Sequence, residues 1–355
     1  MSDIITLKQV EERLCSFGEA YEKIKLNDNF TIVITKRGGR ILGPFKDENS
    51  SSVLWLNKAF KTDAGFKNFL DEKDWNVGGE RVWVLPEMPF FVKERSNFFD
   101  TYIVQEELDP GNYTLDKKDN EVTMNQDVRL DTFEISCRER KFRMEKAIKC
   151  EENPLSGVSN FEELMDSVSY CGFSQTVNLK DLDENHETYL ETWFLTQIKP
   201  EGKLVVPYKG KLNFIDYYEP VENEYFESNE NKMTLKVTGD KRYKVGFMKE
   251  CMTGCSGYMS KTEEGEDYLF IRTYKNDPEN IYCGDPSDRP ELYGCSLYLF
   301  YDSGAFGGFA EYENGCTTIS GDTGVKEATD TVNYYFYFGK KEKLEKIAEV
   351  MLGEE

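Results

Sequence analysis

Apolar and polar residues alternate along most of the chain. In EVTMNQDVRL, residues 121–130, and in KMTLKVT, residues 232–238, nearly every second side chain is apolar. This period of two is typical of a strand that buries one face. Because such stretches recur with Gly, Asn, Asp or Pro between them, the pattern predicts antiparallel sheets.

A helical period appears near the two ends of the chain. TLKQVEERLCSF, residues 6–17, and KKEKLEKIAEVML, residues 340–352, repeat apolar side chains every three or four positions. These side chains are Leu7, Val10, Leu14 and Phe17 in the first stretch, and Leu344, Ile347, Ala348 and Met351 in the second. Thr6 and Gln9 have the spacing of a capping box, which predicts that the first helix begins there.

The strand pattern predicts an all-β fold. We expect one large sandwich of two antiparallel sheets, with peripheral helices at its N- and C-terminal ends. No linker of low complexity divides the sequence. The prediction is therefore a single domain over residues 1–355, with an N-terminal helical segment at 1–28 and a C-terminal helix at 340–355. The acidic stretch at 219–232 is interpreted as a surface loop.

Charge and hydropathy argue against two classes of partner. The chain has 44 Lys and Arg against 66 Asp and Glu, a net charge of −22, so it lacks the basic surface that nucleic-acid binding needs. Neither a signal peptide nor a run of 18 apolar residues is visible, so we expect no membrane contact. The sequence leaves the oligomeric state open.

The cysteines and the single histidine limit the chemistry. Nine cysteines are scattered along the chain, which indicates reduced thiols and a cytoplasmic protein. CMTGC, residues 251–255, lacks the further ligands that a zinc site needs. No glycine-rich stretch has the helix context of a phosphate loop. We therefore expect no metal and no cofactor. His186 lies in the polar stretch DENHETYLE and is interpreted as a surface residue, although an imidazole can transfer protons near neutral pH.

Two stretches place carboxylates beside glycines and aromatic residues. In GGFAEYENGC, residues 307–316, alternation along a strand puts Glu311 and Glu313 on one face and Tyr312 on the other. Such a face is either a solvent-exposed strand or the wall of a binding cleft. In GGERVWVLPE, residues 78–87, the glycines allow a turn that could deliver Arg81 and Glu87 to a cleft. The alternative there is a local salt bridge between Glu80 and Arg81.

These stretches, in their order along the chain, resemble the galactose mutarotase-like superfamily of aldose epimerases, and more narrowly an uncharacterised bacterial branch of it. The similar motifs are GGRILGPF (38–45), VLWLN (53–57), GGERVWVLPE (78–87), TYLETWFLTQIKPEGKLVVPY (188–208), GGFAEYENGC (307–316) and TVNYYFYFG (331–339). The resemblance implies a large antiparallel two-sheet β-supersandwich that binds a sugar or a sugar derivative.

The resemblance also implies roles for single residues. Glu311 matches the glutamate that acts as the base at the anomeric hydroxyl, and Glu313 stands where a sugar-contacting glutamine is common. The family's general acid is a histidine in an Asn-His-aromatic motif, which His186 does not match. The sequence therefore leaves the proton donor unassigned.

Aromatic and polar side chains complete the expected sugar site. The rings of Trp83, Trp193 and Tyr312 can pack against the C–H faces of a pyranose, and Arg81, Glu87, Gln197 and Glu313 can bind its hydroxyls. Trp193 alternatively belongs to the core, because it lies in a strongly apolar strand.

The most direct functional prediction is an aldose 1-epimerase-like isomerase that interconverts sugar anomers by general acid/base catalysis. One alternative is a carbohydrate-binding protein of the same fold without catalysis. Another is a glycoside-cleaving enzyme, which needs two carboxylates about 5–5.5 Å or about 6.5–9.5 Å apart. Residues i and i+2 of a strand are about 6.5–7 Å apart at Cα, so this alternative stays open.

Overall fold

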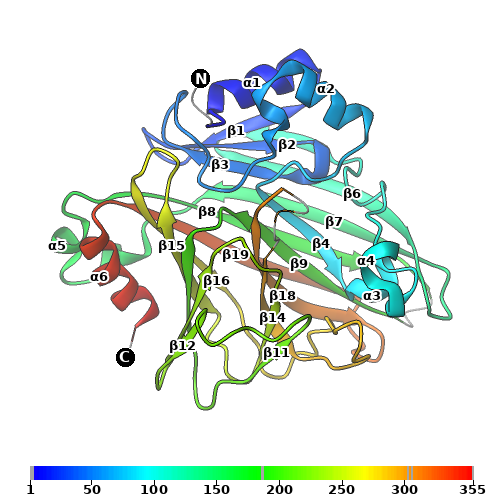
Figure 1. Cartoon of the computed structure of the whole chain (residues 1–355). Coiled ribbons are helices and arrows are strands. Elements are labelled where there is room, and N and C mark those ends of the chain that lie inside the picture. Colours follow the sequence, from blue (N-terminus) through cyan, green and yellow to red (C-terminus); the bar gives the residue numbers. More distant parts are fainter. Residues whose placement is uncertain (1–3, 185–187, 302–303, 305–306, 354–355) are drawn as a thin grey trace.

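Two large antiparallel sheets form the body of the protein (Figure 1). The computed structural model describes residues 4–184, 188–301, 304 and 307–353. The nine-stranded sheet runs in the order β1 (Tyr21–Lys25), β2 (Thr31–Thr35), β3 (Ile41–Phe45), β4 (Glu80–Leu85), β9 (Tyr189–Ile198), β18 (Ala310–Ser320), β17 (Cys295–Tyr301), β14 (Lys244–Met248) and β11 (Phe214–Asp216).

The second sheet has ten strands. Their order is β12 (Phe226–Ser228), β13 (Lys232–Val237), β10 (Gly202–Pro207), β15 (Cys255–Lys261), β16 (Asp267–Tyr274), β19 (Glu327–Phe338), β8 (Ser169–Asp181), β7 (Glu139–Cys150), β6 (Glu121–Asp131) and β5 (Thr114–Lys118). These strands confirm the predicted all-β, two-sheet fold.

Short helices lie around the sheets (Figure 1). They are α1 (Leu7–Ser16), α2 (Asp63–Asp71), α3 (Glu87–Phe91), α4 (Phe98–Thr101), α5 (Phe161–Met165) and α6 (Lys341–Leu352), with 3₁₀ turns η1 (Arg37–Gly39), η2 (Lys58–Lys61), η3 (Arg95–Asn97) and η4 (Pro154–Gly157). The predicted capping box of Thr6 and Gln9 is present at the start of α1. The helical segment predicted at 1–28 is too long, because α1 ends at Ser16 and β1 follows within it.

Apolar side chains from both sheets fill the space between them. Strand β6 alternates strictly between buried and exposed residues, as its sequence predicts. Phe270 of β16 and Phe336 of β19 stack at 4.5 Å between ring centroids, and they belong to the large core that both sheets share. Helix α6 covers the outer face of the ten-stranded sheet, where Leu344 and Ile347 pack with Leu269.

The Gly78–Gly79 turn sets the start of β4. Both residues have positive φ, at 104° and 75°. A Cβ atom at Gly79 would lie 2.3 Å from the carbonyl oxygen of Ile41, and one at Gly78 would lie 2.5 Å from that of Trp55. Only glycine fits such close approaches at positive φ. The turn thereby fixes which side chains of β4 face each side of the sheet.

Within the described ranges, helices are too short or too polar to cross a membrane.

All nine cysteines are unpaired. We therefore expect the protein, purified gently without reductant and then denatured, to titrate with about nine free thiols, the number in the sequence. A thiol-specific chromophoric reagent gives the count directly. A count near one would show disulfide bonds that the structure does not contain.

Candidate functional site

Strand β18 presents its alternate side chains to the two faces of the nine-stranded sheet. Tyr312 points toward the ten-stranded sheet, where its hydroxyl hydrogen-bonds with Ser256 of β15 and its ring packs against Phe270 of β16. Glu311 and Glu313, one residue to either side, must face the opposite way. The two glutamates therefore lie on the outer face of the sheet, as their spacing predicts.

A cavity of about 200 Å³ lies over this outer face. Six of the residues singled out in the sequence line it together: Arg81, Trp83, Glu87, Trp193, Glu311 and Glu313. The other lining residues are Lys244 and a set of mostly aromatic side chains, Trp75, Phe98, Phe99, Tyr102, Val104, Tyr218, Phe300 and Phe309. Residues from β4, β9, β14, β17 and β18 make the floor, and segments around α3 and α4 make the wall.

Arg81 and Glu311 form a buried ion pair at one side of the cavity. The distance from Arg81 Nη1 to Glu311 Oε1 is 2.6 Å, and the guanidinium carbon lies 4.1 Å from the centre of the Trp83 ring. Gln197 also donates to Oε1 of Glu311, at 3.1 Å. Among the described residues, Oε2 of Glu311 has no hydrogen-bond partner, so this oxygen is the one that can accept a proton from a ligand.

Lys244 lines the cavity next to two carboxyl groups, those of Glu87 and Glu313. Its Nζ lies 2.9 Å from Glu87 Oε2 and 3.9 Å from Glu313 Oε2, and 4.7 Å from the centre of the Trp193 ring. Burial lowers the pKa of Lys244, but the nearby carboxylates of Glu313 and Glu87 raise it by more. The pKa of Lys244 therefore lies above its usual value. The ammonium group therefore stays charged at neutral pH.

Glu313 is 1% exposed, and its carboxyl group has a raised pKa. Burial raises its pKa to about 8, with Lys244 opposing the shift and Glu311 and Glu87 adding to it. Trp193 donates from Nε1 to Glu313 Oε2 at 2.9 Å. Since the pKa lies near 8, the carboxyl group carries a proton at neutral pH.

Two residues that were expected to contact the sugar, Gln197 and Tyr312, do not line the cavity. Gln197 supports Glu311 and donates to Asn76 Oδ1 at 2.9 Å. Tyr312 was expected to contact a sugar, and this expectation is wrong, because its ring is buried between the two sheets. Glu80 also faces that interior, where it accepts hydrogen bonds from Thr196 and Tyr334, so it forms no local salt bridge with Arg81.

Several lining residues were not singled out from the sequence. Lys244 has a recognisable signal, because a lysine that begins the apolar strand KVGFM needs a partner if that strand is buried. Phe98, Phe99 and Tyr218 have none, since they come from α4 and from a loop. Phe99 and Tyr218 lie 5.2 Å apart between ring centroids and join these two segments at the cavity.

His186 lies outside the described residues. Among the residues that the structure does describe, no group of three or more His, Cys, Asp or Glu side chains is placed to hold a metal ion.

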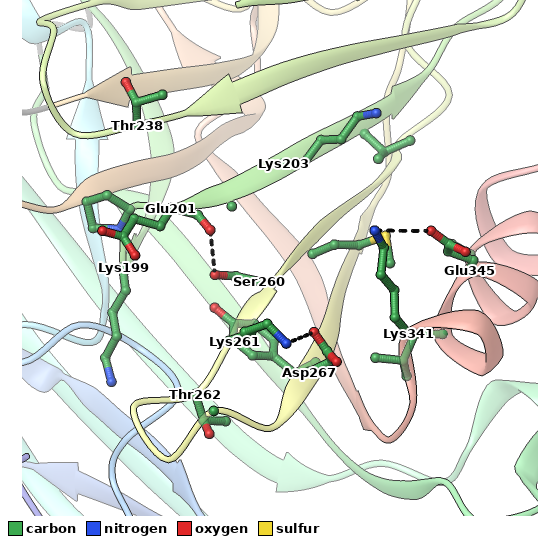
Figure 2. Close-up of a pocket in the computed structure, with 18 of the residues that line it drawn as sticks. Lys199, Glu201, Lys203, Thr238, Ser260, Lys261, Thr262, Asp267, Lys341 and Glu345 are labelled. Atoms are coloured by element: carbon green, nitrogen blue, oxygen red, sulfur yellow. Dashed lines mark hydrogen bonds and ion pairs between the residues drawn. The ribbon is translucent and has the colours of Figure 1, made fainter.

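A wider hollow, of about 1210 Å³, lies between α6 and the hairpin of β15 and β16 (Figure 2). Some of its charged side chains pair with one another, as Lys261 does with Asp267 at 2.6 Å and Lys341 with Glu345 at 3.8 Å. Such exposed pairs are ordinary surface features. The smaller aromatic cavity is the candidate site because its charged groups are buried and meet there from β4, β14, β18 and α3.

Solved structures with a similar course of the chain include sugar enzymes. A putative mutarotase (YeaD) from Salmonella typhimurium has a TM-score of 0.44 and 10% identity, over 88% of this chain and 89% of its own. A galactose 1-epimerase from Lactobacillus acidophilus NCFM has a TM-score of 0.44 and 9% identity, over 91% of this chain and 95% of its own.

A 4-alpha-glucanotransferase from Thermococcus litoralis has a TM-score of 0.38 and 13% identity, over 89% of this chain. The present chain spans only 37% of the length of that enzyme. At these identities and TM-scores, the similarities assign no activity and no site residue to this chain.

No curated protein matches the sequence significantly. A family model does match it, over residues 14–355, and this range includes every residue of the cavity. The chain belongs to the family described as "Family of unknown function (DUF6786)".

Proposed function

We propose that the protein is an aldose 1-epimerase-like enzyme that interconverts the anomers of a monosaccharide in the aromatic cavity. The observation that carries this proposal is Glu311, a buried carboxylate held by Arg81 and Gln197 through one oxygen, while its other oxygen has no hydrogen-bond partner among the described residues. Such a group is positioned to act as a general base.

The cavity suits a single sugar ring. Its volume of about 200 Å³ is below the range of roughly 300–1,000 Å³ typical of sites for drug-sized ligands. Aromatic rings can cover the C–H faces of a pyranose. Arg81, which lines the cavity, supplies a guanidinium group as a polar contact. The site thus combines apolar walls with a few fixed polar groups.

The chemistry begins at the anomeric hydroxyl. Glu311 removes the hydroxyl proton, the electron pair forms the C1 carbonyl, and the bond between C1 and the ring oxygen breaks. The ring oxygen must then receive a proton. Rotation about the C1–C2 bond and reclosure give the other anomer, and both protons return. A positioned base or acid contributes roughly 10²–10⁴-fold to such a step.

Polarimetry on a panel of freshly dissolved aldoses tests the proposal. We expect the protein to accelerate the change in optical rotation of at least one aldose above the rate in buffer. No acceleration with any aldose, together with calorimetric binding of one, would favour the carbohydrate-binding alternative. Release of the aryl group from aryl glycosides would favour the glycoside-cleaving alternative, for which the neighbouring Glu311 and Glu313 are the relevant observation.

The role of the single histidine has its own test. We expect His186→Ala to leave sugar affinity and turnover within a few-fold of wild type, because His186 lies in a polar stretch without the family's histidine motif. Polarimetric rates and calorimetric affinities measure both quantities. A loss of turnover by a hundredfold or more, with unchanged circular dichroism, would assign the proton donor to this histidine.

A further inference from the structure

We infer that Glu313 is the general acid that delivers the proton to the ring oxygen of the sugar. This inference rests on the proposed anomer interconversion and supplies the donor that the reaction requires. It starts from the arrangement of β18, which places Glu313 two residues from the base Glu311, on the same face and in the same cavity.

The contacts of Glu313 leave one oxygen available. Trp193 Nε1 donates to Oε2 at 2.9 Å, and Lys244 Nζ lies 3.9 Å from the same atom. Within the described part of the chain, no hydrogen bond or ion pair involves Oε1. The proton of the acid can therefore reside on Oε1, while Trp193 orients the carboxyl group through Oε2.

The other proton-bearing groups of the cavity are poorer donors. Burial raises the pKa of Tyr102 and of Tyr218 well above that of a free tyrosine, so neither hydroxyl releases a proton near neutral pH. Lys244 holds its proton tightly between Glu87 and Glu313. Arg81 is held in its ion pair with Glu311. Glu313, with its pKa raised to about 8 by burial, is the described lining group matched to donation near neutrality.

The two glutamates then perform complementary steps. Glu311 takes the proton of the anomeric hydroxyl as the C1 carbonyl forms. The electron pair of the breaking bond goes to the ring oxygen, which takes the proton from Glu313. After rotation, the Glu313 carboxylate takes that proton back as the ring oxygen attacks C1, and Glu311 returns its proton to the new hydroxyl. No oxidant, metal or further reactant enters this balance.

The charges around Glu313 set the pH dependence. It faces Lys244 of β14, Glu87 of α3 and Glu311 of β18, and its carboxyl group stays protonated below its raised pKa. A general acid works only in its protonated form. The wild-type rate should therefore fall as the pH rises through about 8.

Glu313→Gln tests the role, because the amide can still accept from Trp193 but cannot supply a proton. We expect turnover to fall by about 10²–10⁴-fold, KM to change by no more than a few-fold, and the alkaline fall in rate to disappear. Glu313→Asp keeps an acid and should recover part of the turnover lost in Glu313→Gln.

Glu191→Gln is the matched control. Glu191 of β9 is equally buried, and burial raises its pKa to about 8 as well, but it accepts from Thr318 and from the backbone of Cys283 and does not line the cavity. Its substitution should leave the alkaline fall in place.

Infrared difference spectra give a readout that needs no substrate. The wild-type minus Glu313→Gln spectrum should contain a protonated-carboxyl C=O band below pH 8 that disappears above it. Absence of this band overturns the inference even if the wild type is active. Full turnover in Glu313→Gln overturns the donor role alone, whereas a wild type that accelerates no aldose overturns the proposed function and the donor role together.

Discussion

Glu311→Gln is expected to lower mutarotation turnover by about 10²–10⁴-fold, because glutamine keeps the size of the side chain but cannot accept the anomeric proton. Sugar affinity should change by no more than a few-fold, since an amide can still hydrogen-bond to a hydroxyl. Polarimetric rates at saturating sugar, with calorimetric affinities, separate the two effects.

Stability must be measured beside these rates. Glu311→Gln replaces the charged partner that lies 2.6 Å from the buried guanidinium of Arg81 with a neutral amide, and breaking a buried ion pair commonly costs about 3–5 kcal/mol. Rates should therefore be compared at a temperature where circular dichroism shows both proteins folded. Glu191→Gln, a buried substitution outside the cavity, should keep wild-type turnover. Unchanged turnover in Glu311→Gln would remove the base assignment.

Lys244→Met is expected to destabilise the protein by about 3–5 kcal/mol, because it leaves the Glu87 carboxylate buried without its cation. Methionine has a similar length, so the effect comes mainly from the lost charge. Urea unfolding followed by tryptophan fluorescence measures the free energy of unfolding.

The double variant Lys244→Met/Glu87→Gln separates charge from packing. Glu87 Oε2 lies 2.9 Å from Lys244 Nζ, nearer than Glu313 Oε2 at 3.9 Å, so Glu87 is the partner to neutralise together with Lys244. Neutralising Glu87 as well should recover most of the lost stability. Lys46→Met, which breaks an exposed pair with Glu266, should leave the unfolding midpoint nearly unchanged. Equal losses in the single and double variants would mean that packing, and not the ion pair, makes Lys244 important.

The parts of the site that were predicted from the sequence follow from local geometry. Because side chains alternate along β18, Glu311 and Glu313 lie on one face of the strand and Tyr312 lies on the other. This follows from the local strand geometry alone. The Gly78–Gly79 turn likewise starts β4 so that Arg81 and the cavity-lining Trp83 share one face.

The parts that were missed depend on contacts between distant segments. Residues 53–57, one of the motifs that carry the resemblance, make only isolated bridges. Tyr102 and Val104, which line the cavity, lie in the segment that follows α4. Tyr218 reaches the site from a loop, and alternation says nothing about where a loop packs. Lys244 meets Glu87 across 157 residues of sequence, which no local pattern can show.

The most direct test of the central claim is a crystal structure of the protein with an aldose whose mutarotation it accelerates. The account predicts electron density for one sugar ring in the cavity, against Trp83 or Trp193, with its anomeric hydroxyl within hydrogen-bond distance of Glu311 and its ring oxygen near Glu313. A sugar bound instead in the hollow beside α6, with the aromatic cavity empty, would contradict it.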